Sequence, residues 1–483
     1  MKKRIFALLL AVLLIALCGC NNTTTQRPDD DTQTLAPTVD LSGQFTVGYG
    51  RVNITPEESV PLAGAGNTSQ RMSTGTLTYL YSTCIAITDT QGETILLFSN
   101  DILVAWTATF TEFRKAISEA TGIPVDNIQM ACTHTHNAPD LENSEVPSAA
   151  RYKASLKKWV VKAAQLALAD RRPATMYTGT TNTSGLNFIR HYVTESGEVK
   201  GDNFGDDIQS PITSHHHEAD NQLQLIKFVR EEGKDIVMAN WQTHPHRTSA
   251  SATYDVSADL IDAMRERMEK ELDCNFIYFT GAAGNINPTS RISEKNVTSN
   301  YLEQGRMLAK YALDAMPNLK QANTGDIKLT STTYVATVDH TEDNKLAKAK
   351  EVANYWASTN DLAGSVKLAQ ENEMNSPYHA NGIISKANKP KTMDMKIYAL
   401  SFGDVAFVFA PYEMYDTQGT YIKGNSPYDM TFISTCANET YSYIPDEEGH
   451  KNNSYEANAG YFVKGTAEAL ANEYVSLLNQ IHP

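Results

Sequence analysis

The sequence has little positive charge for its length. Among 483 residues, 41 are Lys or Arg and 56 are Asp or Glu, which gives a formal net charge of −15. Proteins that bind nucleic acids need clustered Lys and Arg to neutralise phosphates. The composition therefore argues against a nucleic acid as a partner. The hydrophobic content of 41% is ordinary for a soluble globular protein, and the length allows a large core.

Long apolar runs are also scarce, and the one at the start is too short to span a membrane comfortably. It covers residues 5–17, follows a basic tip and ends in "LCGC". This order is typical of a secretory signal peptide, and its end resembles a bacterial lipoprotein cleavage box. We expect residues 1–19 to be removed and Cys20 to be lipidated, which would hold an extracytoplasmic lipoprotein at a membrane surface. The alternative is an ordinary signal peptide with an incidental cysteine.

Residues 20–44 have almost no apolar side chains and contain Pro, so they predict a flexible tether. From residue 45 to 483, short apolar strand patterns alternate with amphipathic helix patterns. Strands mixed with helices throughout predict one large α/β domain with a mixed sheet. Residues 340–395 are more polar, and we expect them to form a helical insertion on the main body.

Cysteine is rare, and only four remain after the predicted leader: Cys84, Cys132, Cys274 and Cys436. Each stands in an apolar, strand-like segment, and no two have metal-ligand spacing. We expect buried free thiols, although an oxidising compartment would permit one disulfide.

Histidines, in contrast, stand in a repeated pattern. "ACTHTHNAPD" places His134 and His136 after an apolar strand pattern, and "DIVMANWQTHPHR" places His244 and His246 in the same way. If the strands continue, both members of each pair lie on one face, at a strand end where open sheets build sites. Two such ends predict a metal site, and zinc would bind three or four protein ligands.

Other segments have a functional and a structural interpretation each. Glu413 and the tyrosines at 441 and 443 follow apolar strands, so they are either ligands or packed core residues. The Gly-rich "TGAAGNINP" could direct backbone N–H groups at a substrate oxygen, or it could be a tight turn. The triplet His215–His217 has turn residues on both sides and predicts a solvated loop.

Together these segments resemble the catalytic domain of neutral/alkaline non-lysosomal ceramidases, zinc-dependent amidases that split ceramide into sphingosine and a fatty acid. The resemblance runs in family order from residue 45 to the end of the chain. It implies a ceramidase-like mixed-sheet zinc hydrolase domain. The matching segments are "VGYGRVNITP", "LLFSNDIL", "THTHNAPD", "GLNFIRHYV", "NWQTH", "FTGAAGNINP", "APYE", "CANETYSYI" and "SYEANAG".

By position in these motifs, the resemblance assigns four zinc ligands and three further site residues. The ligands it implies are His134, His244, Glu413 and Tyr443. The groups it places at the reacting bond or the substrate are His136, Arg190 and Tyr455.

Two departures from the family concern the substrate. Asn287 stands where the family has a serine discussed as catalytic, and Asn can donate to an oxyanion but cannot act as a serine nucleophile. The family's C-terminal immunoglobulin-like domain is also not expected here. We therefore predict a zinc-dependent amidase acting on ceramide or a related lipid amide. Two alternatives stay open: a zinc hydrolase of another envelope amide or ester, and a substrate-binding lipoprotein without turnover.

Overall fold

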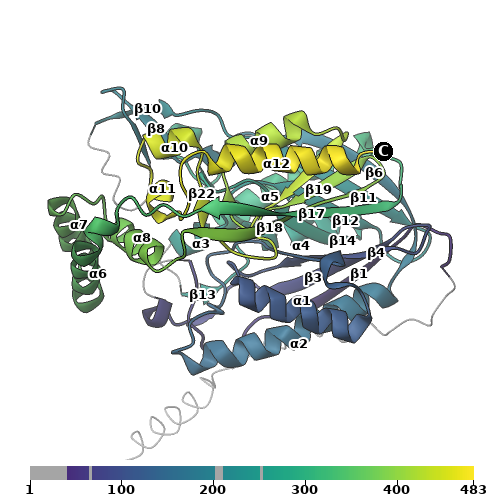
Figure 1. Ribbon diagram of the computed structural model, residues 1–483. Coiled ribbons are helices and arrows are strands. Elements are labelled where there is room, and N and C mark those ends of the chain that lie inside the picture. The colour runs from purple at the N-terminus through teal and green to yellow at the C-terminus, as the bar shows by residue number, and fades with distance from the viewer. Residues whose placement is uncertain (1–40, 65–67, 202–209, 251–253) are drawn as a thin grey trace, which may run out of the picture. The chain divides into compact units, whose positions relative to one another are not determined.

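A large mixed β-sheet crosses the centre of the described chain (Figure 1). The computed structural model describes residues 41–64, 68–201, 210–250 and 254–483, all within the compact unit Leu35–Pro483. The strand order is β14-β12-β11-β6-β1-β3-β4-β5, with β16 also beside β6. Only β4 with β5 and β12 with β14 pair in parallel within this sheet as described. The strands are β1 (Thr46–Asn53), β3 (Tyr81–Thr88), β4 (Thr94–Asn100), β5 (Ile128–Cys132), β6 (Arg172–Asn182), β11 (Gln222–Arg230), β12 (Ile236–Trp241), β14 (Asn275–Thr280) and β16 (Lys320–Gln321).

A second sheet of four strands packs against one face of the first. Its order is β17-β18-β19-β21, and β19 and β21 are parallel. Alternate residues of both sheets, such as Met238 and Ile85 from the first and Phe407 and Phe432 from the second, fill the space between them. This is the sheet-on-sheet packing that alternating burial produces. The strands are β17 (Ile327–Thr337), β18 (Thr392–Phe402), β19 (Val405–Phe409) and β21 (Met430–Ser434).

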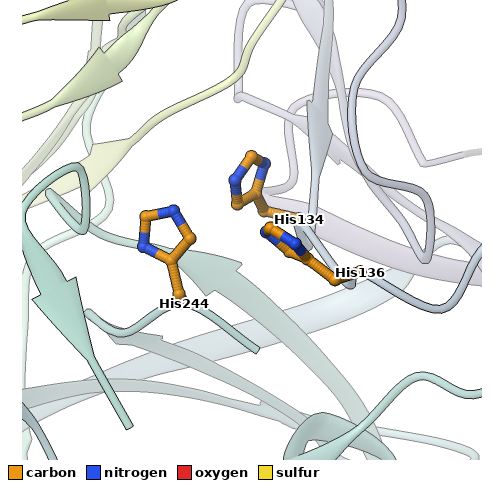
Figure 2. Close-up of side chains that lie close together, drawn as sticks. All are labelled: His134, His136 and His244. Carbon is orange, nitrogen blue, oxygen red and sulfur yellow. The ribbon is translucent and has the colours of Figure 1, made fainter. Parts of the chain in front are cut away.

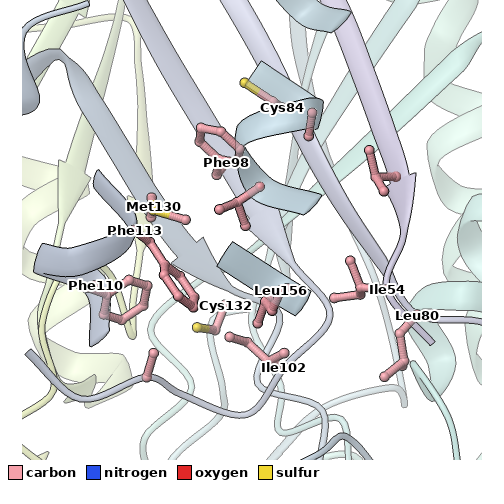
Figure 3. Close-up of a cluster of buried hydrophobic side chains, with 14 of the residues drawn as sticks. Ile54, Leu80, Cys84, Phe98, Ile102, Phe110, Phe113, Met130, Cys132 and Leu156 are labelled. Atoms are coloured by element: carbon pink, nitrogen blue, oxygen red, sulfur yellow. The ribbon is translucent and has the colours of Figure 1, made fainter. Parts of the chain in front are cut away.

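Helices cover the outer faces of both sheets. In Figure 3, Phe98 and Met130 of the large sheet meet Phe110 and Phe113 of α1 and Leu156 of α2. The other helices pack in the same way, and the result is a helix–sheet–sheet–helix arrangement that confirms the predicted α/β fold with mixed sheets. The helices are α1 (Thr107–Thr121), α2 (Pro147–Ala169), α4 (Leu260–Leu272) and α5 (Tyr301–Ala315) on the large sheet, with α9 (Asp416–Asn425) and α12 (Thr466–Ile481) on the small one.

The predicted helical insertion is confirmed between β17 and β18. It consists of α6 (Leu346–Thr359), α7 (Leu362–Glu371) and α8 (Pro377–Ala387), and has a small apolar cluster of its own. Helix α8 lies against α11 (Tyr455–Ala459), as Figure 1 shows. A Cβ on Gly382 would stand 2.1 Å from the carbonyl oxygen of Asn458, so only glycine permits this approach. The insertion is therefore fixed closely to α11.

The remaining elements are short and lie mostly in connections. They are β2 (Gly75–Thr76), β7 (Phe188–Ile189), β8 (His191–Thr194), β9 (Val199–Gly201), β10 (Ile212–His215), β13 (Asp255–Val256), β15 (Ile286–Asn287), β20 (Glu413–Met414), β22 (Tyr443–Ile444), α3 (Arg247–Ala250) and α10 (Glu447–Lys451). Six of the two-residue strands form three pairs, β2 with β13, β7 with β15 and β20 with β22, and the last of these belongs to the site described below.

The four cysteines of the domain are buried free thiols, as expected. Across the described ranges, the helices are too short or too polar to span a lipid bilayer. The predicted signal peptide, Cys20 and nearly all of the predicted tether lie outside the described residues, so membrane anchoring stays a prediction.

Candidate metal centre

Strand ends from both sheets meet at one edge of the molecule. The hydroxyl of Thr280, the last residue of β14, donates to the carbonyl of Thr133 just after β5. The N–H of Thr435, just after β21, donates to the carbonyl of Thr280. Hydrogen bonds therefore connect the carboxyl ends of three strands, which is where open sheets commonly hold their sites.

His134 and His136 lie beyond the end of β5 and not within it. The strand stops at Cys132, and His134 has a left-handed backbone with φ 67°, which is uncommon for a residue other than glycine. The predicted continuous strand to residue 136 is therefore wrong at its end. The two rings nevertheless converge, and their centroids are 5.1 Å apart.

The second histidine pair reaches the same place. Strand β12 ends at Trp241, and His244 and His246 follow in a loop. The N–H of His136 donates to the carbonyl of Pro245 at 3.1 Å, which connects the two H-x-H segments directly. The rings of His134 and His244 are 4.9 Å apart. Backbone hydrogen bonding between loops, and not strand alternation, brings the histidines together.

Three histidines present one ring nitrogen each to a common point (Figure 2). These ligand atoms of His134, His136 and His244 all lie within 4.8 Å of one another. In each ring, Nδ1 lies beside a backbone carbonyl, which can only accept. Nδ1 therefore carries a proton in each ring, and Nε2 is the atom that remains to bind a metal, as in metal-binding histidines held by an outer hydrogen bond. The carbonyls belong to Leu103 at 3.0 Å from His134, Gly64 at 2.8 Å from His136 and Ile286 at 3.0 Å from His244.

Glu413 supplies a carboxylate to the same point. One of its oxygens, Oε2, lies 3.0 Å from Nε2 of His244 and 3.2 Å from Nε2 of His134. Burial favours the neutral acid, but the charge and hydrogen bonding of the two histidines hold the pKa of Glu413 well below its usual value. Glu413 is therefore an anion that lies against imidazole nitrogens.

The donor set fits a divalent cation. The Nε2 atom of His136 is shielded from solvent and has no hydrogen-bond partner among the described residues, while that of His134 faces the Glu413 carboxylate at 3.2 Å. Burial is the main cause that lowers the pKa of His136, and it lowers that of His244 to about 3, so both are neutral ligands at pH 7. For His134, burial opposes protonation, but Cys436 and Glu413 outweigh it and raise its pKa well above the usual value. A metal would displace the proton that this raised pKa favours on His134, and three imidazoles with one carboxylate are ligands that zinc accepts.

Tyr443 lies beside Glu413 because of a two-residue strand pair. Strands β20 and β22 are parallel, with Glu413 opposite Tyr443. The Tyr443 ring stacks on His244 at 6.5 Å between centroids and is 5.8 Å from the ring of Tyr455. The guanidinium of Arg190 lies over it, with Cζ 5.5 Å from the centroid. The structure thus brings the predicted residues Arg190, Tyr443 and Tyr455 together beside the histidines.

Glu456, which the sequence interpretation did not include, holds Arg190 in place. Its Oε1 accepts from Nε of Arg190 at 2.6 Å, and its Oε2 accepts from His191 at 3.0 Å and from the Tyr415 hydroxyl at 2.9 Å. Only 1% of Glu456 is exposed. Its place next to Tyr455 in "SYEANAG" was a signal that could have identified it.

Asn287 does not contact the proposed metal ligands directly but contacts His246, which lies beside them. Its Oδ1 accepts from Nε2 of His246 at 3.1 Å, and the His246 ring is 5.5 Å from His136 and 5.7 Å from His244. His246, which the H-x-H pattern placed at the predicted metal site but to which the family resemblance gave no role, therefore connects Asn287 to the histidine cluster. The H-x-H pattern that it shares with His244 was its signal.

The glycine-rich turn is a tight packing element. Its N–H groups at Gly281, Gly284 and Ile286 donate to backbone carbonyls of the protein. A Cβ on Gly284 would stand 2.7 Å from the carbonyl oxygen of Glu413. The small residues of this turn therefore allow β20, and with it Glu413, to approach the metal ligands.

The prediction of a solvated loop at the histidine triplet is wrong for His215. Its ring is buried, stacks on Phe188 and contacts the Ile189 carbonyl and the Ser290 hydroxyl, at 2.6 and 2.8 Å. His215 ends strand β10, and the next two residues are partly exposed. Packing against the β7 segment, which the local sequence does not show, explains the difference.

Known proteins resemble this chain in structure but share little sequence identity with it. No protein-family model and no curated protein matches the sequence. Among solved structures, neutral ceramidase from Pseudomonas aeruginosa superimposes with a TM-score of 0.67 at 15% identity, over 90% of this chain and 74% of that one. A ceramidase complexed with C2 gives a TM-score of 0.66 at 14% identity, over 90% and 75% of the two chains. The resemblance predicted from the motifs is confirmed at this level: the chain has the fold of the neutral ceramidases.

Proposed function

We propose that the protein is a zinc-dependent hydrolase that cleaves an amide bond. The observation that carries the proposal is the convergence of three imidazoles, each held by a backbone carbonyl, with the carboxylate of Glu413. The ceramidase fold supports the reaction class, and one of the similar structures is a ceramidase in complex with C2. We propose a lipid amide related to ceramide as the substrate. The predicted anchor at Cys20 would place the activity at a membrane surface.

His134, His136, His244 and Glu413 would hold the zinc. When bound, the metal supplies Lewis-acid polarisation of the substrate carbonyl and makes water more acidic, with a pKa that falls from about 15.7 toward ~7 in the best-studied zinc enzymes. The protein's own part is positioning. The carbonyls of Leu103, Gly64 and Ile286 fix the ring tautomers. The two H-x-H loops thus hold in fixed positions the ring nitrogens that would bind the metal.

The tyrosines and Arg190 would act on the substrate beside the metal. Burial keeps the pKa values of Tyr443 and Tyr455 above their usual value, so both hydroxyls are neutral and can donate hydrogen bonds. Arg190 keeps a positive charge next to Tyr443. We propose that these groups orient the amide and stabilise negative charge on its oxygen. The His246–Asn287 pair would support the same oxygen from the histidine side.

The proposal is tested with the full chain, prepared free of metal and then loaded with zinc. We expect hydrolysis of at least one N-acyl amide that chelation abolishes and added zinc restores. The substrates compared are short- and long-chain N-acyl sphingosines, simple fatty-acid amides and the matching esters. Hydrolysis of other amides but of no N-acyl sphingosine would exclude ceramide as the substrate and leave the proposal of an amidase intact. Tight zinc binding with no turnover of any substrate in this set would contradict the proposal that the protein is an enzyme.

Alanine at Gly64 is expected to weaken zinc binding by roughly ten- to a hundredfold, as loss of an outer hydrogen bond to a metal ligand does. The new Cβ would stand 2.6 Å from Nδ1 of His136, so the ring has to move away from the Gly64 carbonyl. Gly92→Ala is the matched control, because Gly92 has a φ of 89°, close to the 98° of Gly64, and a Cβ there meets nothing within 4 Å. Zinc affinity is measured by competition with a chromophoric chelator. Equal affinity in the two variants would contradict the role of Gly64.

A further inference from the structure

A row of aromatic rings leads from the metal centre to the helical insertion. Tyr443 stacks on His244, and Tyr455 is 5.8 Å from Tyr443. Tyr378 of α8 is 6.0 Å from Tyr455, and Trp356 of α6 is 4.8 Å from Tyr378. The three outer rings are partly exposed. Neighbouring rings thus connect the reacting centre to a surface of the insertion.

The row ends at a cavity of about 370 Å³, which is within the range of roughly 300–1,000 Å³ typical of small-molecule sites. The cavity lies between α6 and α8 on one side and the short helical turn Thr68–Gln70 on the other. It is lined by the Trp356 ring, two alanines and the amide groups of Gln70, Asn354, Asn360 and Asn381.

Both walls of this cavity are connected to the metal centre. Gln70 precedes Arg71, whose guanidinium donates to the backbone carbonyl of His136 at 2.9 Å. The other wall is fixed through α8, because Gly382 lies against the backbone of α11, the helix that starts at Tyr455. A group bound here would therefore have a fixed position relative to the reacting bond.

The lining indicates the chemistry of that group. None of the described residues around the cavity is charged, and none is Leu, Ile, Val, Met or Phe. An alkyl chain would cover four amide groups without replacing their hydrogen bonds to water, which is unfavourable. An ion would find no opposite charge. Amide groups beside an indole ring instead match a neutral molecule that has many hydroxyl groups and also an apolar face.

We propose that this cavity is a subsite for a neutral saccharide carried by the substrate, at the end of the molecule away from the amide that is cleaved. The inference rests on the proposed hydrolase function for its connection to catalysis. It narrows the substrate class from a lipid amide in general to an amide that carries a sugar.

The test is saturation-transfer NMR on the zinc-loaded full chain with three neutral disaccharides (cellobiose, maltose and N,N′-diacetylchitobiose) and with dodecanamide as the alkyl probe. We expect at least one disaccharide to bind. The double variant Asn354→Ala/Asn381→Ala is expected to weaken that binding by roughly tenfold or more, because each amide contributes a hydrogen bond. Asn388→Ala, an exposed amide at the end of α8 outside the cavity, is the matched control and should bind as the parent does.

Binding of no disaccharide would overturn the subsite, and so would disaccharide binding that the double variant leaves unchanged. Dodecanamide binding that the double variant weakens, with no disaccharide bound, would assign the cavity to an acyl chain and overturn it as well. The unfolding midpoints of both variants should match the parent, which checks their folding. Disaccharide binding without any zinc-dependent hydrolysis would contradict the proposed function and leave the subsite standing, so the two failures are distinguishable.

Discussion

Replacement of His244 with alanine is expected to lower zinc affinity by more than about a hundredfold and to abolish amide hydrolysis. Loss of an outer partner alone costs roughly ten- to a hundredfold in affinity, and loss of a direct ligand should cost more. Nε2 of His244 also makes the shorter of the two histidine contacts to Glu413, at 3.0 Å against 3.2 Å for His134, while its Nδ1 contacts the Ile286 carbonyl. Its removal therefore also deprives the carboxylate of this contact. Zinc content after dialysis and the rate of amide hydrolysis measure the effect.

His246→Ala is the matched control for this variant. His246 belongs to the same H-x-H segment, but its Nε2 contacts the side-chain oxygen of Asn287 at 3.1 Å. It should retain zinc and lose only part of the activity, through Asn287. Full zinc retention in His244→Ala, or equal zinc loss in the two variants, would contradict the assignment of His244.

Two further variants decide which groups complete the ligand set. The family resemblance implies Tyr443 as the fourth ligand, whereas the geometry groups His136 with His134 and His244. If His136 binds the metal, His136→Ala lowers zinc affinity as strongly as His244→Ala does, and Tyr443→Phe changes it little. Neutral Tyr443 is a weak ligand because burial and the charge of Glu413 raise its pKa. The opposite pattern would support the resemblance over the geometry.

The two histidine pairs show how far the sequence pattern alone could lead. Strand alternation predicted that both pairs meet at a sheet edge, and they do. The reason was different, because β5 ends at Cys132 and β12 at Trp241. The left-handed backbone of His134 and the bond from the His136 N–H to the Pro245 carbonyl bring the rings together. Such loop contacts leave no periodic pattern in the sequence, so only the strands themselves were predictable.

The partners of Glu413 and Arg190 were hidden for a related reason. Glu413 meets Tyr443 through the register of a two-residue strand pair between segments far apart in the chain. Glu456 meets Arg190 across 266 positions. A local pattern carries no information on register between distant short strands, and here the motif order of the family supplied it for Tyr443 and Arg190. The polar helical insertion, in contrast, has strong local signals and was predicted within a few residues of its bounds.

Glu456→Ala is expected to lower the free energy of unfolding by about 3–5 kcal/mol, as removal of one partner from a buried ion pair does. The variant leaves the Arg190 guanidinium, which is 2% exposed, without its carboxylate, and it also removes the acceptor of His191 and Tyr415. Since Arg190 lies over Tyr443, hydrolysis should fall while zinc binding stays close to the parent's. Urea unfolding and zinc titration measure the two effects. Glu448→Ala, a partly exposed carboxylate in nearby α10 whose side chain is 41% exposed, is the control and should change stability little.

The effect of Glu456 on stability has a defined pH dependence. Burial disfavours its charge, but Arg190 and His191 outweigh burial and hold the pKa of Glu456 far below the ordinary 4.5. A carboxyl group whose pKa is lower in the folded state than in the unfolded state binds fewer protons when folded. Its contribution is therefore complete above about pH 4.5 and is lost as the pH falls toward the folded-state value. The stability difference between parent and Glu456→Ala should therefore be smaller at acid pH than near neutrality. A difference that instead grew as the pH fell would show that Glu456 is not the charged partner of Arg190, since only the ionised carboxylate can hold that guanidinium over Tyr443.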